Sequence, residues 1–375
     1  MATTQPLAAM AGLRTLINGG NAVDAAVAAA ATLNVVEPMS TGVGGDLFAL
    51  VKMGPHAKIT ALNASGRSAG ATSIQELRDQ NFSEIPSDSP YSVTVPGTVS
   101  GWHSLTNRYG NMDLQECLKP AIEYAENGYP VSEIIAAQWK ANAARISKTG
   151  LKSDLLINGR PPNPGEIVTM PELAQTLRTI GEGGMDAFYK GDLASKITAH
   201  VQSLGGWLTK EDFAQHEASW VKPISTEYRG VTCWECPPNG QGLNTLIALN
   251  ILSGFDISKM GFQSIETYHH LIEAMRLAFI DGETYIADPD TSNIPIKSLL
   301  SKEHADYKRS FITPDNVADV DVSINQNLIN DTVYISVVDK DGNACSLINS
   351  LFEAFGSGIV VPETSIALHN RGKGF

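Results

Sequence analysis

Residues 330–343 have the sequence NDTVYISVVDKDGN. A polar loop ends here, and from Val333 onward apolar residues alternate with other residues, which predicts a half-buried β-strand. Asp341-Gly342 predicts a hairpin turn, because glycine accepts the positive φ that such turns need. We expect the return strand to run from Ala344 to Asn349. This hairpin is the part of the chain from which the fold is best inferred.

Thr332 is the residue of this hairpin with a special chemical use. If the peptide bond before it is cut, its hydroxyl and its new α-amine lie on one residue, and the amine can act as the base for the hydroxyl. Threonine is also a common β-branched strand residue. The hairpin alone favours that ordinary role, so the rest of the chain has to decide between the two.

Composition indicates a soluble globular protein. The chain has 375 residues, 43% of them hydrophobic, with a mean hydropathy of −0.07, and can form one large domain or two. No apolar stretch reaches the length of a membrane span. The net charge of −13 disfavours nucleic acid and anionic membranes as partners.

No metal or cofactor is expected. Cys233 and Cys236 form a CxxC without the second pair that a zinc site needs. His269 and His270 are adjacent, so they point to different sides of a helix. The glycine-rich stretch 40–46 lacks the lysine of a phosphate-binding loop and is better explained as a tight turn into a strand.

The N-terminus, MATTQP, has no basic region followed by an apolar core. We therefore expect a cytoplasmic protein, or a periplasmic or secreted one if a leader is missing from this sequence.

Strands are expected at both ends of the chain and helices in the middle. Asn21 can cap a helix over Ala22–Leu33 that is apolar on nearly all sides and should be buried. Further strands are expected at Leu47–Lys52, Ile59–Ala64, Tyr91–Gly97 and Val231–Glu235, and helices at Leu7–Leu16, Val99–Tyr109, Leu114–Asn127, Ser132–Ile146, Pro171–Ile180, Asp192–Leu204, Asn244–Ile251 and Ile265–Ile280. This order favours layers of sheet and helix over a doubly wound fold.

The stretch before the hairpin, Asn316–Asn330, is rich in Asp and Asn and has no helical period. It predicts a mobile linker that leads directly to Thr332. A displaceable segment at this place is what self-cleavage before Thr332 would need.

Several segments together resemble the γ-glutamyltransferase (γ-glutamyl transpeptidase) family across nearly the whole chain. They are GGNAVDAAVAA (19–29), VEP (36–38) with STGVGG (40–45), VPG (95–97) with Gly101-Trp102, GEGGMDAFYKG (181–191), and SVVDKDGN (336–343) with FGSG (355–358). The resemblance implies an α+β fold, the four-layer αββα sandwich of the N-terminal-nucleophile (Ntn) hydrolases. It also implies a precursor that cuts itself into a large-subunit region, 1–331, and the start of a small-subunit region, 332–375, which stay associated.

The resemblance also assigns site residues. Thr332 corresponds to the nucleophile, and the self-cleavage would fall between Asp331 and Thr332. Ser350 corresponds to a hydroxyl residue that holds the Thr332 oxygen by a hydrogen bond. Arg67 corresponds to the arginine that binds the substrate α-carboxylate with two parallel hydrogen bonds, although Ser68 follows it where the family has an acidic residue.

The chain departs from the family where the α-ammonium group of the substrate would bind. Phe352 stands at a substrate-binding position where a polar residue is usual, and the stretch 369–375 has two cations and no acid. A cationic Arg371 facing the site would repel an ammonium group. The sequence also stops before the family's paired serines and Gly-Gly oxyanion loop, so we expect a sandwich incomplete at the C-terminus, with little activity if these residues are the whole protein.

Three functions therefore remain open. The first is γ-glutamyl transfer or glutathione hydrolysis through a threonine acyl-enzyme, with a small-molecule γ-glutamyl or related acyl amide as substrate. The second is a glutaryl or cephalosporin-type acylase that uses the same nucleophile. The third is a catalytically silent, uncleaved homologue that acts only as a binding or folding unit.

Overall fold

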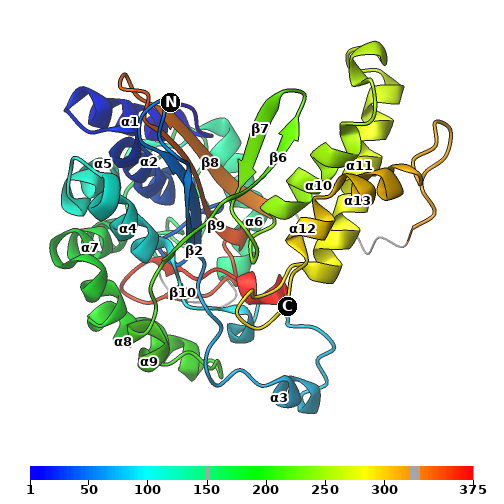
Figure 1. The fold of residues 1–375 in the computed structure, drawn as a ribbon. Helices are drawn as coiled ribbons and strands as arrows, with labels where there is room; N and C mark the ends of the chain where they lie inside the picture. The colour runs from blue at the N-terminus through cyan, green and yellow to red at the C-terminus, as the bar shows by residue number, and fades with distance from the viewer. Residues whose placement is uncertain (148–152, 321–329, 375) are drawn as a thin grey trace. The chain divides into compact units, whose positions relative to one another are not determined.

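The computed structural model describes residues 1–147, 153–320 and 330–374. The chain forms two units: residues 1–219 with 328–375, and residues 220–327. These are units of packing, and they differ from the two regions that a cut before Thr332 would create. The candidate site residues all belong to the first unit. Figure 1 labels the helices and strands along the chain.

An antiparallel sheet forms the centre of the first unit. Its strand order is β5-β2-β1-β9-β8, and β5 ends the sheet at the point where the chain leaves this unit. The strands are β1 (Asp46–Lys52), β2 (Thr60–Ala64), β5 (Ser219–Val221), β8 (Asn330–Val338) and β9 (Ala344–Glu353). The hairpin predicted from the sequence is therefore β8 and β9, closed by a turn in which Gly342 has φ of +75°.

The alternation along β8 determines which face of the sheet is buried. Val333, Ile335 and Val337 are at most 1% exposed, whereas Tyr334 and Val338 on the opposite face are 50% and 62% exposed. The apolar face packs against α2 (Ala22–Val36). Because the side-chain period of a strand is 2, Thr332 lies on the face directed away from α2.

Helix α2 is buried over all of its 15 residues, as its composition predicted. Its N-terminus is fixed by a capping box, in which the Asn21 side chain accepts from the backbone N–H of Asp24 and the Asp24 carboxylate accepts from that of Asn21. Asp339 in the β8–β9 turn accepts a further hydrogen bond from Ala22 N at 3.0 Å. The helix start and the hairpin are thus attached to each other.

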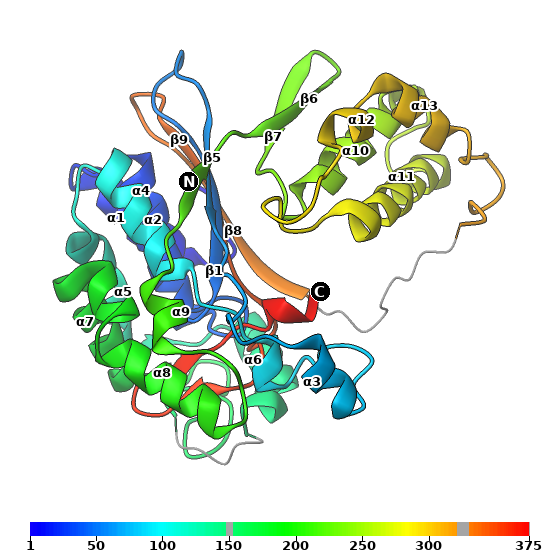
Figure 2. The ribbon, with the colours of Figure 1, turned by 60° about the horizontal axis from the view of Figure 1, so that its bottom comes forward.

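Helices cover one face of this sheet, as Figure 2 shows for α1, α2, α4 and α5. The helices of this unit are α1 (Pro6–Ile17), α2, α3 (Ile74–Asp79), α4 (Thr98–Tyr109), α5 (Leu114–Asn127), α6 (Glu133–Ser147), α7 (Pro171–Tyr189), α8 (Asp192–Ser203) and α9 (Lys210–Ala214). Two short strand pairs, β3 (Tyr129–Pro130) with β4 (Ile167–Val168) and β10 (Val360–Val361) with β11 (Ile366–Ala367), complete it.

Two glycines allow backbone segments to approach closely near the start of β1. A Cβ on Gly45 would lie 2.2 Å from the carbonyl oxygen of Ser350, and one on Gly66 would lie 1.4 Å from that of Val95. No side chain fits at either distance. Gly45, in the turn before β1, therefore lets Asp46 lie beside β9, and Gly66 lets the loop after β2 lie against Val95. This confirms the interpretation of residues 40–46 as a turn into a strand.

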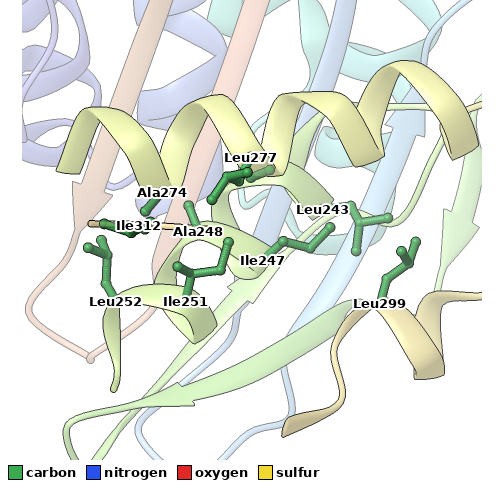
Figure 3. Close-up of a cluster of buried hydrophobic side chains, with 10 residues drawn as sticks. Leu243, Ile247, Ala248, Ile251, Leu252, Ala274, Leu277, Leu299 and Ile312 are labelled. Atoms are coloured by element: carbon green, nitrogen blue, oxygen red, sulfur yellow. The ribbon is translucent and has the colours of Figure 1, made fainter. Parts of the chain in front are cut away.

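The second unit has its own core. It contains the hairpin β6 (Ile224–Tyr228) and β7 (Val231–Glu235) and the helices α10 (Gly242–Leu252), α11 (Ile265–Tyr285), α12 (Ile296–Leu299) and α13 (Lys302–Arg309). Aliphatic side chains of α10 and α11 meet in this core, with Leu299 and Ile312 beside them (Figure 3).

Most predicted elements are present with ends shifted by a few residues, but Tyr91–Gly97 is not a strand. A short 3₁₀ helix, Pro90–Ser92, starts this stretch, and Val95 N and Gly97 N then donate to Arg67 O and Gly45 O, two separate bonds that form no ladder. Pro90 and Pro96 remove backbone donors there. Most of the predicted linker, residues 321–329, lies outside the described residues. In the part of the chain that the structure describes, no helix is both long and apolar enough to cross a bilayer.

Candidate active site

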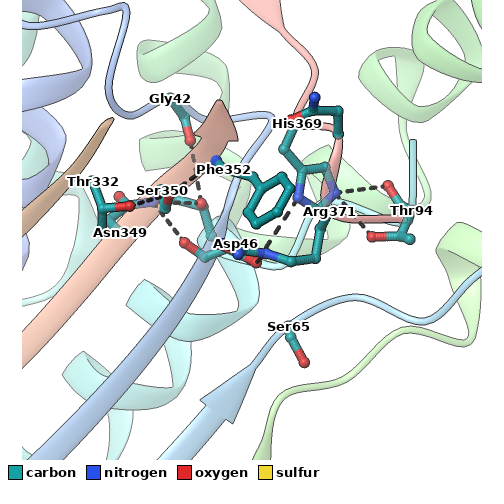
Figure 4. A network of polar contacts seen from close by, with 12 residues as sticks. Gly42, Asp46, Ser65, Thr94, Thr332, Asn349, Ser350, Phe352, His369 and Arg371 are labelled. Atoms are coloured by element: carbon teal, nitrogen blue, oxygen red, sulfur yellow. Dashed lines mark hydrogen bonds and ion pairs between the residues drawn. The ribbon is translucent and has the colours of Figure 1, made fainter. Parts of the chain in front are cut away.

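Three polar side chains form a row across three neighbouring strands. Thr332 on β8 pairs with Ser350 on β9, and Ser350 pairs with Asp46 on β1. Directly paired residues of antiparallel strands point to the same face of a sheet. The row therefore lies on the face opposite α2, and Figure 4 shows it together with the side chains around it.

The Thr332 and Ser350 hydroxyl oxygens are 3.0 Å apart, a hydrogen-bond distance at which either can donate. Ser350 is fully buried, whereas the Thr332 side chain is exposed. The backbone N–H of Phe352 also donates to the Ser350 oxygen, at 2.9 Å. This second bond leaves the Ser350 proton available for Thr332, so Ser350 can stabilise negative charge that develops on the Thr332 oxygen.

Asp46 holds Arg371 with two parallel hydrogen bonds. Arg371 Nε donates to one carboxylate oxygen at 2.6 Å and Nη2 to the other at 3.0 Å. Asp46 is 1% exposed, so this is a buried carboxylate with a fork-shaped partner. The guanidinium carbon of Arg371 also lies 4.5 Å from the centre of the Phe352 ring, within the range of a cation–π contact.

His369 lies beside this ion pair in neutral form. Its Nε2 is 3.0 Å from the Thr94 hydroxyl and 3.1 Å from the Thr94 carbonyl oxygen, which can only accept, so Nε2 carries the hydrogen. Nδ1 then lies 4.0 Å from an Asp46 carboxylate oxygen and has no hydrogen-bond partner among the described residues. Burial lowers the pKa of His369, and the nearby Asp46 charge only partly opposes this.

Arg67 lies in the loop after β2 and is exposed. Its backbone carbonyl accepts from Val95 N, which fixes this loop to the segment before α4. Burial, and after it the nearby positive charge of Arg67, lower the pKa of His216 to about 4. His216 therefore lies close enough to Arg67 for its titration to respond to that charge.

The Asn349 side-chain amide lies on the buried face of the sheet and holds in place the strands that carry Thr332, Ser350 and Asp46. Asn349, next to Ser350, donates to the Asp46 backbone oxygen and to the Thr98 hydroxyl, both at 2.9 Å. The Thr98 hydroxyl in turn donates to the Gly42 carbonyl oxygen at 3.2 Å. These bonds connect β9, the start of β1, the glycine-rich turn and α4, so the site is built on rigid elements.

Of the residues expected at the site, the structure brings Thr332, Ser350 and Phe352 together. Asp46 was not predicted, because an acidic residue after a glycine-rich turn has no distinctive sequence signal. Arg371 was expected to repel an ammonium group if it faced the site, and this stays a prediction; the structure shows it paired with the buried carboxylate of Asp46. The available clue was that a cation so close to a buried strand needs an acidic partner.

Known proteins match the chain over nearly its full length. The γ-glutamyltranspeptidase family model covers residues 8–375. The glutathione hydrolase-like YwrD proenzyme of Bacillus subtilis (strain 168) is 38% identical, over 98% of this chain and 70% of that protein. The crystal structure of cephalosporin acylase from Bacillus halodurans is 42% identical with a TM-score of 0.87, over 99% of this chain and 69% of that one. The crystal structure of Helicobacter pylori γ-glutamyltranspeptidase is 30% identical with a TM-score of 0.79, over 87% of this chain and 96% of that one.

These solved structures confirm the Ntn-hydrolase fold and its α+β class. The described residues supply one large antiparallel sheet and the helical layer on its buried face. The matched range contains the strand pair that carries Thr332 and Ser350, and the relatives are amide hydrolases and acyl transferases. The chain is therefore an enzyme of this type, and it belongs to the γ-glutamyltranspeptidase family.

Proposed function

We propose that the chain cleaves itself between Asp331 and Thr332 and then transfers or hydrolyses γ-glutamyl groups, as in glutathione hydrolysis, through an ester on Thr332. The observation that carries this proposal is the hydroxyl pair at the start of β8, where the Thr332 oxygen lies 3.0 Å from that of Ser350. The alternative, a cephalosporin-type acylase, would use the same nucleophile. The relatives include both a glutathione hydrolase-like protein and a cephalosporin acylase, so their names do not favour the acylase.

Self-cleavage would begin at the exposed Thr332 hydroxyl. Its oxygen attacks the carbonyl carbon of Asp331, the C–N bond breaks, and the Asp331 acyl group moves to that oxygen while the Thr332 nitrogen becomes a free amine. Water then hydrolyses the ester. The pairing of β8 with β9 is irregular between Asn330 and Thr332, and such bulges often reorient residues next to active sites.

In turnover the free amine of Thr332 would act as the base for its own hydroxyl. The hydroxyl attacks the amide carbonyl of the substrate, the amine product leaves, and the acyl group remains on Thr332. Water or an amino acid then removes it. Ser350 touches the reacting oxygen throughout, and its hydrogen bond strengthens as negative charge develops there.

The large and small fragments would stay associated after the cut, because they share one sheet and its ion pairs. Residues of β1 pair along β9 from Asp46 to Lys52, and Ala2 exchanges two backbone hydrogen bonds with Ser336. Asp46 with Arg371 also joins the two fragments. The cytoplasmic location expected from the N-terminus stays a prediction, which cell fractionation can test.

Mass spectrometry of the purified chain tests the cleavage. We expect two fragments, the second beginning at Thr332. Thr332→Val keeps the shape of the side chain but lacks the nucleophile, so it should remain a single chain, whereas Thr332→Ser should still be cut. An uncut wild-type chain, or a cut Thr332→Val chain, contradicts the mechanism. Release of p-nitroaniline from γ-glutamyl-p-nitroanilide by the cut protein tests the substrate.

A further inference from the structure

His369 has a buried ring nitrogen that makes no hydrogen bond to the described residues. The side chain is fully buried, and Nδ1 is the nitrogen without a partner. Nδ1 lies 4.0 Å from the Oδ2 atom of Asp46, which is too far for a hydrogen bond. Because a buried polar atom without a partner costs free energy, this arrangement needs an explanation.

The ring of His369 is held so that Nδ1 keeps facing Asp46, as Figure 4 shows. Nε2 lies 3.0 Å and 3.1 Å from the two oxygens of Thr94, and the backbone N–H of His369 donates to Gly44 O at 3.0 Å. A flip of the ring would lose the bonds to Thr94. In the neutral ring Nδ1 can only accept, so two acceptors face each other with no proton between them.

A proton on Nδ1 would reverse the sign of this contact. The imidazolium ring donates from both nitrogens, and an approach of about 1 Å would give a charge-assisted hydrogen bond to Asp46. Its acceptor would be Oδ2, the same oxygen that accepts from Arg371 Nε at 2.6 Å. Protonated His369 and Arg371 would therefore compete for one carboxylate oxygen.

Among the described residues, three ionisable groups lie near the ring, each from a different element. Asp46 starts β1, Arg371 starts the 3₁₀ helix Arg371–Gly374, and His216 follows α9. Burial lowers the pKa of His369 most, the charge of Asp46 raises it, and that of Arg371 lowers it. The pKa of His216 is lowered to about 4, so His216 adds no charge near neutral pH. His369 is therefore neutral at pH 7 and takes its proton in acid.

Phe352 connects this group of charges to the hydroxyl pair. Its ring centre lies 4.5 Å from the Arg371 guanidinium carbon, and its backbone N–H donates to Ser350 at 2.9 Å. Its φ of +76° is strained for a residue with a Cβ, so Phe352 depends on these contacts to keep its conformation. If Asp46 turned toward His369, Arg371 would lose its shortest bond and hold the Phe352 ring less firmly.

We propose that His369 is a positioning residue for the Asp46–Arg371 pair. The neutral ring leaves the carboxylate to Arg371, whereas the protonated ring takes it over and weakens the support of Ser350. Self-cleavage at Thr332 would then slow in acid, and this part of the inference rests on the proposed function. A purely structural role of His369 would end with its bonds to Thr94.

NMR titration of the histidine ring nitrogens in the full-length Thr332→Val chain tests the coupling without any cleavage. We expect the Nε2–H form of His369 at pH 7.5 and a midpoint below about 6.5. Asp46→Asn should lower this midpoint by about one pH unit. Arg371→Gln should raise it by about as much, because His369 becomes the cationic partner of Asp46, and this variant decides if Asp46→Asn does not fold.

His200 in α8 is the internal control of this titration. It too has an unpartnered ring nitrogen among the described residues and a pKa lowered by burial. Its midpoint should stay the same in both variants. A His369 midpoint that neither variant moves would overturn the proposal, as would a ring that takes no proton above pH 4.5.

The pH dependence of self-cleavage tests the consequence for the site. The uncut chain has no free amine on Thr332, so that amine cannot cause the dependence. Between pH 7.5 and one unit below the midpoint of His369, the wild-type rate should fall at least threefold more than that of His369→Gln, which has no proton to gain. His200→Gln is the matched control and should follow the wild type.

Equal pH dependences of the wild type and His369→Gln would also overturn the proposal. The proposed function is judged separately, by the appearance of an N-terminus at Thr332. A chain that is cut, but whose His369 midpoint ignores Asp46 and Arg371, would refute this inference and leave the proposed function standing. In a chain that is never cut, the proposed function fails and the NMR titration still decides the coupling.

Discussion

At the scale of single residues, the candidate site depends on strand register. Thr332, Ser350 and Asp46 share one face because each is paired directly with the next. A slip of one residue in β9 would turn Ser350 to the face of α2 and bring Asn349 beside Thr332. The buried hydrogen bonds of Asn349 to Asp46 and Thr98 resist such a slip.

Removing the Ser350 hydroxyl should slow self-cleavage. In Ser350→Ala we expect the N-terminus at Thr332 to appear about tenfold more slowly, the effect of losing one hydrogen bond to the reacting oxygen. Ser346→Ala is the matched control, because Ser346 lies on the same strand and contacts the Tyr334 hydroxyl at 3.0 Å. A mass-spectrometric time course measures both rates, and equal rates in the two variants would contradict the role given to Ser350.

His216 should make the fold less stable in acid. Its pKa is lowered to about 4 in the fold from an ordinary value of about 6.5, so the unfolded chain binds the proton more readily. The free energy of unfolding should therefore fall as the pH drops from about 6.5 to about 4, by up to about 3 kcal/mol.

Urea unfolding of His216→Gln at pH 7 and pH 4.5 measures this contribution. The variant should lose less stability between the two pH values than the wild type does. His56→Gln, at an exposed position, is the control and should behave like the wild type. A His216→Gln chain with an unchanged pH dependence would show that His216 is not the titrating group.

At the scale of elements, the buried α2 helix is the support on which the hairpin lies. Small side chains let α1, α5, β8 and β9 approach it from different sides. The capping box at Asn21 and the bond from Ala22 to Asp339 fix its start next to the hairpin turn. The position of β8, and with it that of Thr332, therefore depends on the volume of residues in α2.

A larger side chain in α2 should destabilise the first unit. Ala28 is fully buried, so Ala28→Leu adds volume to a packed interior and should cost about 1–3 kcal/mol of unfolding free energy. Ala141→Leu, at an exposed position of α6, is the control and should change stability by less than about 0.5 kcal/mol. Urea unfolding of the two variants checks this, and equal stabilities would show that α2 is not tightly packed.

At the scale of the whole molecule, the chain has two cores. The first surrounds α2 and the central sheet, and the second lies between α10 and α11. The candidate site belongs to the first unit alone. The second unit is a continuous stretch, residues 220–327, inserted between parts of the first.

Separate cores predict separate responses to mutation. Leu277 is 1% exposed in the core of the second unit, and Leu277→Ala should cost that unit about 2–5 kcal/mol. Calorimetry of the full chain should then show one transition moved to lower temperature and the other nearly unchanged. A single transition that moves as a whole would show that the two units unfold together.

Local patterns were enough to predict much of the fold. The alternation of apolar residues located the β8–β9 hairpin. Asn21 located the start of α2, and the run of alanines showed that this helix is buried. All three features depend on residues that are near neighbours in the sequence. The strand expected at Tyr91–Gly97 was wrong: Pro90 starts a 3₁₀ helix just before it, and Pro96 removes a backbone donor within it.

The sequence by itself determined the hairpin, the buried helix beneath it and Thr332 as the candidate nucleophile. The tertiary structure alone decided what surrounds that threonine. Asp46 and Arg371 are 325 residues apart in the chain, and their ion pair exists only because β1 pairs with β9, an approach that Gly45 allows. Contacts at such separations leave no periodic signal in the sequence, which is why Thr332 could be proposed as the nucleophile from the sequence and the pairing of Asp46 with Arg371 could not.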